Sequence, residues 1–106
     1  MIQSDVINEV VTRIVSRFNP DKIILFGSYA NGTQNADSDL DLLIIQDSEL
    51  PMQKRGFEIR KSLIGTMVPI DLLIYTKSEF DQEKSLAFSF LNSAIKNSIV
   101  LYERAD

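Results

Sequence analysis

The sequence predicts an α/β (α+β) domain with a small mixed β-sheet and helices mainly on one side. Short apolar runs typical of strands alternate with longer segments in which apolar residues return every three or four positions. Their order is helix, strand, turn, strand, helix, strand, helix, strand. No internal repeat or linker interrupts this order, so we expect a single domain spanning residues 1–106.

The first half of the chain predicts one helix and two strands. In residues 4–18 the apolar spacing is helical, and Ser4 or Asp5 is expected to cap this helix. Residues 22–27 form a short apolar run that ends at a glycine. After a small polar segment, residues 39–46 form a second run whose apolar part suits a buried strand.

The second half predicts two helical regions and two further strands. Residues 51–63 have helical character, with Gly56 as a weak point. A third strand is expected over residues 68–75. Ser78 is expected to cap a last helical region, which leads into a closing strand at residues 98–103.

Composition excludes several classes of function. The chain contains no cysteine and no histidine, so thiolate and imidazole metal sites and a Ser-His-Asp triad are impossible. The formal charge of −4 argues against strong direct binding of nucleic acid but is compatible with docking onto a basic protein. No apolar run approaches the roughly 20 residues of a membrane span, and the chain begins without the basic segment of a signal peptide. We therefore expect a soluble, cytoplasmic protein.

Three carboxylates are expected to converge. Asp39 and Asp41 lie two positions apart at the start of a strand, so their side chains point to the same face. Asp71 lies inside the apolar strand 68–75, on the face opposite to its apolar neighbours. If these strands pair, the three carboxylates repel one another strongly, and a divalent cation would relieve the repulsion. Mg²⁺ favours carboxylates together with phosphate oxygens and water, and a pair of such ions serves phosphoryl-type displacement.

The pair Gly27-Ser28 is suited to hold phosphate beside these carboxylates. A glycine at the end of a strand lets the backbone approach a phosphate closely. The serine offers a hydroxyl and an N–H group at the start of a helical turn, where anions are favoured. A strand, a Gly-Ser turn and a strand with paired aspartates together predict a nucleotide site.

Two other interpretations of the acidic segment fit less well. An EF-hand could begin with Asp37-x-Asp39-x-Asp41, but it requires glycine at its sixth position and glutamate at its twelfth, where this chain has Leu42 and Ser48. A solvated acidic turn would explain an isolated Asp-x-Asp pair, but not its combination with a Gly-Ser pair and a third aspartate. Asp37 itself is expected to be a turn residue rather than a ligand.

Other side chains receive simpler interpretations. Phe88 and Phe90 are expected to pack in the core and at the edge of the sheet. Basic residues of the middle helix are expected to form a solvated face, or alternatively to help hold a triphosphate or a partner. These basic residues are Lys54, Arg55, Arg60 and Lys61.

The segment "GSYANGTQNADSDLD" consists of Gly-Ser, ten residues and Asp-x-Asp. This pattern accounts for all of residues 27–41 and resembles the signature of the polymerase-beta-like nucleotidyltransferase superfamily, in which a third carboxylate lies in a later apolar strand. The resemblance covers residues 22–75 closely and implies the nucleotidyltransferase fold, ATP as substrate and Mg²⁺, as two ions, as cofactor. It also implies roles for five residues: catalysis and metal binding by Asp39, Asp41 and Asp71, and nucleotide binding by Gly27 and Ser28.

The small size of the chain narrows the resemblance. Larger members of the superfamily append domains that hold the acceptor, whereas this chain has little beyond the catalytic core. It resembles a minimal nucleotidyltransferase (MNT), the antitoxin of a HEPN/MNT toxin–antitoxin pair. In that family the MNT protein transfers AMP from ATP to a tyrosine of the HEPN-domain toxin, a ribonuclease, and so silences it. The resemblance implies the same protein adenylyltransferase activity and the same partner here.

One position departs from the family pattern, and two alternative functions stay open. Many relatives read Gly-Ser-x-Ala-Arg-Gly, whereas this chain has Asn31 in place of the arginine. A neutral amide cannot steady a triphosphate as a cation does, so we expect reduced efficiency of transfer. The alternatives are a non-catalytic module that neutralises the toxin by contact, and a nucleotidyltransferase with a small-molecule acceptor.

Overall fold

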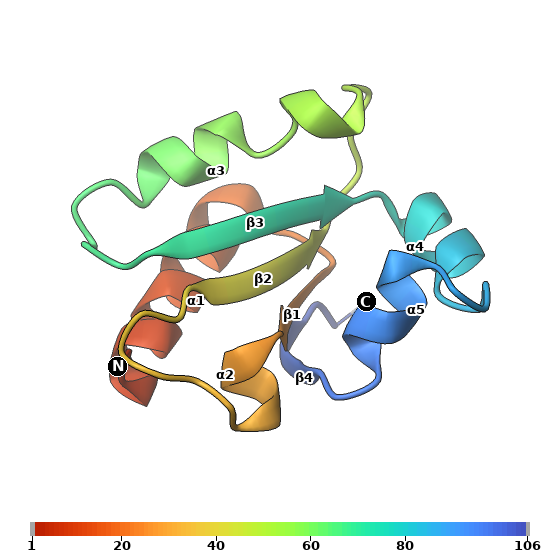
Figure 1. Cartoon of the computed structure of the whole chain (residues 1–106). Coiled ribbons are helices and arrows are strands. Elements are labelled where there is room, and N and C mark those ends of the chain that lie inside the picture. The colour runs from red at the N-terminus through yellow and green to blue at the C-terminus, as the bar shows by residue number, and fades with distance from the viewer. Residues whose placement is uncertain (1, 106) are drawn as a thin grey trace.

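The computed structural model of the chain describes residues 2–105, and its elements follow the predicted order (Figure 1). No helix in this part of the chain combines the length and apolarity needed to cross a bilayer. The elements are α1 (Ser4–Phe18), β1 (Lys22–Phe26), α2 (Ser28–Asn31), β2 (Leu40–Ile45), the 3₁₀ turn η1 (Met52–Lys54), α3 (Phe57–Ser62), β3 (Ile70–Tyr75), α4 (Lys77–Glu83), α5 (Phe90–Ile95) and β4 (Ile99–Glu103).

The four strands form one mixed sheet in the order β3-β2-β1-β4. Strand β1 runs antiparallel to both of its neighbours, whereas β2 and β3 are parallel. The α/β class and the small mixed sheet expected from the sequence are therefore confirmed, whereas the helices cover both faces of the sheet rather than mainly one. Strands β2 and β3 begin at the edge of the sheet where β1 ends. The first residues of β2 and β3 and the turn that follows β1 therefore lie close together.

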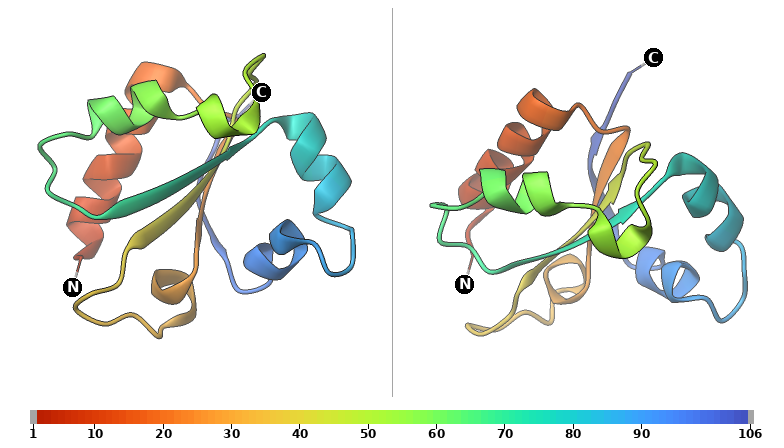
Figure 2. Two further views of the ribbon diagram at one scale, coloured as in Figure 1. Left: turned by 45° about the horizontal axis from the view of Figure 1, so that its top comes forward. Right: turned by 90° about the horizontal axis from the view of Figure 1, so that it is seen from above.

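Alternating residues divide the core into two layers. Leu40, Leu42 and Ile44 of β2 face the layer that includes Val10 and Ile14 of α1. The intervening side chains, Leu43 and Ile45, face the layer formed with Phe80 of α4 and Leu91 of α5. Figure 2 shows the long helix α1 and helix α3 on one side of the sheet and helices α4 and α5 on the other. This second face is covered only in part.

Helix α1 has the predicted bounds but a different N-terminal cap. Its amphipathic spacing buries Val10 and Ile14 completely against the sheet. The N-cap is Gln3, whose carbonyl accepts from the N–H groups of residues 6 and 7 at 3.1 Å. Ser4 and Asp5 therefore already lie within the first turn, and the expectation that either one caps the helix is wrong.

The later helical regions are shorter than the sequence pattern suggests. The segment predicted over residues 51–63 breaks at Gly56, which has φ of 89°, so the weak point predicted there is confirmed. The next helix is capped by Thr76 rather than by Ser78. Thr76 forms a reciprocal capping box with Glu79: its hydroxyl accepts from the Glu79 N–H, and the Glu79 carboxylate accepts from the Thr76 N–H.

Two of the basic residues of the predicted middle helix hold the fold together; of these, Arg60 is exposed as expected, whereas the side chain of Arg55 is not. The side chain of Arg55 is only 7% exposed and donates to both carboxylate oxygens of Glu79, at 2.5 and 3.0 Å. It also donates to the carbonyl of Ile74 at 3.2 Å. Arg60 donates to the carbonyl of Leu72 at 3.0 Å. These guanidinium groups bind the backbone of β3 to the segment that precedes and forms α3.

Candidate active site

Two of the predicted aspartates lie side by side on neighbouring strands. Asp41 of β2 is the register partner of Asp71 on the parallel strand β3. On its other side, Asp41 is the register partner of Phe26, the last residue of β1. Register partners project to the same face of a sheet, so Asp71, Asp41 and Phe26 form a row across three strands. Asp39 adjoins the start of β2 two residues before Asp41, where the alternation directs it to the same face.

This row occupies the open part of the second face. Helices α4 and α5 pack over Leu43, Ile45 and Tyr75, whereas Asp39 and Asp71 are exposed and Asp41 is half-buried. The three carboxylates are thus accessible to a large substrate.

Asp41 is the carboxylate that is most affected by its surroundings. Burial raises the pKa of the Asp41 carboxyl above its ordinary value, and the charges of Asp71 and Asp39 raise this pKa further. The three groups therefore interact electrostatically as the sequence pattern predicted. Ionised Asp41 is destabilised in this position, and a bound cation would remove that cost.

Gly27 is required beside Asp41 for two separate reasons. Its backbone has φ of 74° and ψ of −154°, a conformation that is essentially restricted to glycine. In addition, a Cβ atom at this position would overlap Oδ2 of the Asp41 carboxylate. The backbone of the Gly-Ser turn and the carboxylate of β2 are consequently in direct contact.

Ser28 begins the single helical turn α2 that follows. The Gly27 carbonyl accepts from the N–H groups of Ala30 and Asn31, both at 3.1 Å, which closes this turn. Ser28 is half-buried at the same edge of the sheet as the aspartates. The structure thus brings all five predicted site residues to one edge, while their individual roles stay predictions.

The two other polar residues singled out in this loop have local roles. The side-chain oxygen of Asn31 accepts from the hydroxyl and the N–H of Thr33, at 2.6 and 3.2 Å. Its amide group is therefore engaged within its own loop. Asp37 lies exposed in a turn, where its N–H donates to the side chain of Asn35 at 2.8 Å.

The donor set suits Mg²⁺ bound together with a phosphate substrate. Within residues 2–105 no three carboxylates are placed closely enough to enclose a metal ion by themselves. Mg²⁺ is usually held by one or two carboxylates plus substrate phosphates and waters, rather than by a cage of protein ligands alone. The adjacent carboxylates of Asp41 and Asp71, with Asp39 beside them, match that mode of binding.

The aromatic residues near the site differ from the sequence expectation. Phe88 is fully exposed, so the expectation that it packs is wrong. Phe90 is 55% exposed and is not a core residue, but its ring does pack against Phe26. Phe88 also adopts φ of 72°. Phe26, for which no role was predicted, belongs to the site because it precedes Gly27 on the strand. The alternation of side-chain directions along β1 could have indicated that Phe26 lies at the site.

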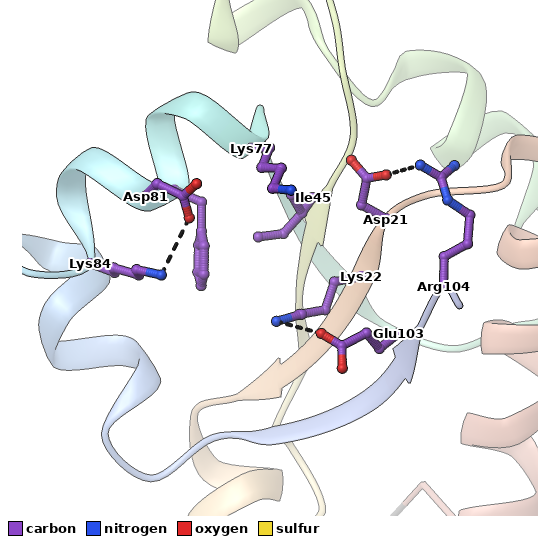
Figure 3. Close-up of a pocket in the computed structure, with 9 residues that line it drawn as sticks. Asp21, Lys22, Ile45, Lys77, Asp81, Lys84, Glu103 and Arg104 are labelled. Atoms are coloured by element: carbon purple, nitrogen blue, oxygen red, sulfur yellow. Dashed lines mark hydrogen bonds and ion pairs between the residues drawn. The ribbon is translucent and has the colours of Figure 1, made fainter. Parts of the chain in front are cut away.

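A separate cavity of about 140 Å³ lies at the opposite end of the sheet (Figure 3). Its walls include Lys22, Glu103 and Ile45, which are at the ends of their strands remote from Asp41. Ion pairs line the walls of this cavity, with Lys22 Nζ 2.9 Å from Glu103 and Lys84 Nζ 3.3 Å from the carboxylate of Asp81. Its cations are largely neutralised within the fold, and none of the predicted site residues lines it.

Comparisons with known proteins agree with this geometry. The family model described as "Nucleotidyltransferase domain" matches residues 7–101. The chain is similar to "Putative protein adenylyltransferase MJ0604" of Methanocaldococcus jannaschii, with 31% identity over 107 positions that cover 96% of this chain and 100% of the relative. A second protein of that organism, "Putative protein adenylyltransferase MJ0141", is 36% identical over 72 positions that cover 68% of this chain and 69% of the relative.

Two solved structures share the fold. One is described as a putative nucleotidyltransferase from Sulfolobus solfataricus, with a TM-score of 0.67 and 20% identity, covering 94% of this chain and 79% of that one. The other is described as a toxin–antitoxin with AMP-PNP, with a TM-score of 0.64 and 21% identity, covering 92% of this chain and 73% of that one. The nucleotidyltransferase fold and enzyme class expected from the sequence are thus confirmed. The chain belongs to the nucleotidyltransferase domain family.

Proposed function

We propose that the chain is a Mg²⁺-dependent protein adenylyltransferase that transfers AMP from ATP to a tyrosine of a HEPN-domain ribonuclease toxin, and so acts as its antitoxin. The observation that carries this proposal is the row of Asp71 and Asp41 in contact with Gly27 on an open sheet face. Two relatives named as protein adenylyltransferases support the acceptor class. A fold neighbour described as a toxin–antitoxin with AMP-PNP supports the nucleotide and the partner.

The residues of the site divide the work of the reaction. The backbone at Gly27 and the hydroxyl of Ser28 would hold the phosphates, because glycine allows close approach to the chain. Asp39, Asp41 and Asp71 would hold Mg²⁺. When bound, Mg²⁺ supplies neutralisation of the charge that develops on the phosphate oxygens.

Transfer requires one bond to form and one to break. The acceptor tyrosine oxygen attacks the α-phosphorus of ATP, and the bond from that phosphorus to the bridging oxygen breaks, which releases pyrophosphate. A tyrosine hydroxyl has a pKa of about 10 and is a weak nucleophile at neutral pH. In this proposal the exposed carboxylate of Asp71 would accept its proton as the new bond forms.

An open site favours a protein acceptor. Asp39 and Asp71 are both exposed, so a side chain on the surface of another protein can approach them. The formal charge of −4 would steer the chain toward a basic partner, as a ribonuclease is where it binds RNA.

The test is the mass of the partner after reaction. The chain is incubated with ATP, Mg²⁺ and a HEPN-domain ribonuclease toxin, and we expect one or more added AMP groups on a tyrosine of the toxin. Asp71→Asn should abolish the modification. Asp37→Asn also removes one negative charge, but from an exposed turn between α2 and β2, and should leave the modification intact.

Two results would decide against the proposal. A partner that is inhibited but unmodified would establish a non-catalytic binding module. A chain that leaves the partner unmodified and active, yet adenylylates a small hydroxyl compound, would establish a small-molecule acceptor.

A further inference from the structure

An aromatic pair continues the row of carboxylates. Phe26 is the register partner of Asp41 and comes directly before Gly27. The ring of Phe90, the first residue of α5, meets the ring of Phe26 edge to face, with centroids 6.0 Å apart and an angle of 84° between the planes. The row therefore runs from Asp71 through Asp41 and Phe26 to Phe90.

Phe90 is held firmly and yet leaves its ring accessible. Its neighbour Leu91 is fully buried, which anchors α5 to the sheet. The hydroxyl of Ser89 caps α5 by accepting from the N–H of Asn92 at 3.0 Å, and donates to the carbonyl of Glu83 at 2.9 Å. Against this fixed backbone, the Phe90 side chain is 55% exposed while Phe26 is 9% exposed. Phe90 thus contacts Phe26 and still leaves about half of its surface exposed to solvent.

We propose that the exposed face of Phe90 is the platform on which the base of the bound nucleotide stacks. This inference rests on the proposed function in one respect, namely that the phosphates lie at Gly27 and Ser28. Phe26 immediately precedes Gly27 in the sequence, and the ring of Phe90 contacts the ring of Phe26. A base is joined to its phosphates through one sugar, so the aromatic ring lies where the base would reach.

The chemistry of the row favours a base over the acceptor at this end. The polar end of the row, Asp41 and Asp71, suits phosphates and metal, whereas an aromatic ring suits the π-face of a base. Asp71, which is proposed to take the proton of the acceptor, lies on β3 at the other end. Base and acceptor therefore use opposite ends of the same row and do not compete for space.

The test compares a ligand that has a base with one that lacks it. Binding of ATP and of inorganic tripolyphosphate is measured by calorimetry with Mg²⁺ present. Phe90→Ala should weaken binding of ATP by about tenfold, the range found for loss of one base–aromatic stack, and should leave tripolyphosphate unchanged. Phe90→Trp keeps an aromatic face and should bind ATP at least as tightly as the original chain.

The control is Phe57→Ala, which removes a ring that is 67% exposed on α3, on the opposite side of the sheet. It should change neither affinity. Equal weakening of both ligands by Phe90→Ala would show a scaffold role and overturn the inference, as would an unchanged affinity for ATP. If the original chain binds neither ligand, the proposed phosphate site fails first and the platform fails with it.

Discussion

Replacing Asp41 by asparagine should make the chain more stable and abolish its activity. Asparagine has nearly the same shape, so the contact with Gly27 is kept while one negative charge is lost. Residues paired on adjacent strands lie about 4.8 Å apart, and two like charges at that distance repel by ~0.9 kcal/mol in water and by ~3.5 kcal/mol at an effective dielectric of ~20. Asp39 and Asp71 are exposed, so the lower end applies and we expect a gain of about 1 kcal/mol.

Thermal unfolding followed by circular dichroism, at low salt with a chelator, measures this gain. A stabilisation of ~1 kcal/mol should raise Tm by about 4 °C in a domain of this size. Added Mg²⁺ should stabilise the original chain more than the variant, so the difference should shrink. A variant that is less stable than the original chain in chelator would refute the reasoning, because it would show that the Asp41 charge contributes favourable interactions to the fold.

Substitutions of Gly27 and Glu79 test the Gly-Ser turn and the ion pair between Arg55 and Glu79, and Gly32→Ala is the control for the first. Gly27→Ala should cost about 1–3 kcal/mol from backbone strain and displace the Asp41 carboxylate, so that transfer is lost. Gly32→Ala, where φ is also positive but a Cβ atom meets nothing within 4 Å, should lose stability in urea and keep transfer. The Arg55 guanidinium lowers the pKa of Glu79 from its ordinary value of 4.5 to about 2. The pair therefore stabilises the fold fully above pH 4.5, and this contribution disappears as the pH falls through about 2. Because Glu79 is a third exposed, Glu79→Gln should cost only about 1–2 kcal/mol at pH 7, and urea unfolding should show this difference vanishing between pH 4.5 and pH 2. A constant difference across that range would contradict the role of the Glu79 charge.

The sequence was sufficient for the elements that depend on local periodicity. Helix α1 has its predicted bounds, and the strands differ from their predicted ranges by at most two residues at either end. The alternation of side chains also placed Asp41 and Asp71 on one face, because strand geometry fixes that relation once β2 and β3 pair.

Features that depend on tertiary contacts could not be predicted. Arg55 looked like one of several solvated cations, since its partner Glu79 lies 24 residues further along the chain. Phe88 and Phe90 are large apolar residues of the kind that usually pack in a core. The neighbouring sequence does not indicate that Phe88 adopts a positive φ. The contact of Phe90 with Phe26 joins segments more than sixty positions apart, and it is this contact that brings α5 to the site.

The parallel pairing of β2 and β3 also determines when the site can come into existence. Parallel strands cannot be joined by a tight hairpin and require a crossover, which here passes through α3. The entropy of closing that crossover must be lost before the contacts between the strands form. Since Asp41 and Asp71 meet only through this pairing, a chain in which β2 and β3 have not paired lacks the proposed nucleotide site. If nucleotide and Mg²⁺ bind as proposed, they bind the native chain in preference to the unfolded one and shift the folding equilibrium toward the native chain by mass action. In a cell, the supply of nucleotide would then influence how much of this protein survives proteolysis, as well as how fast it works.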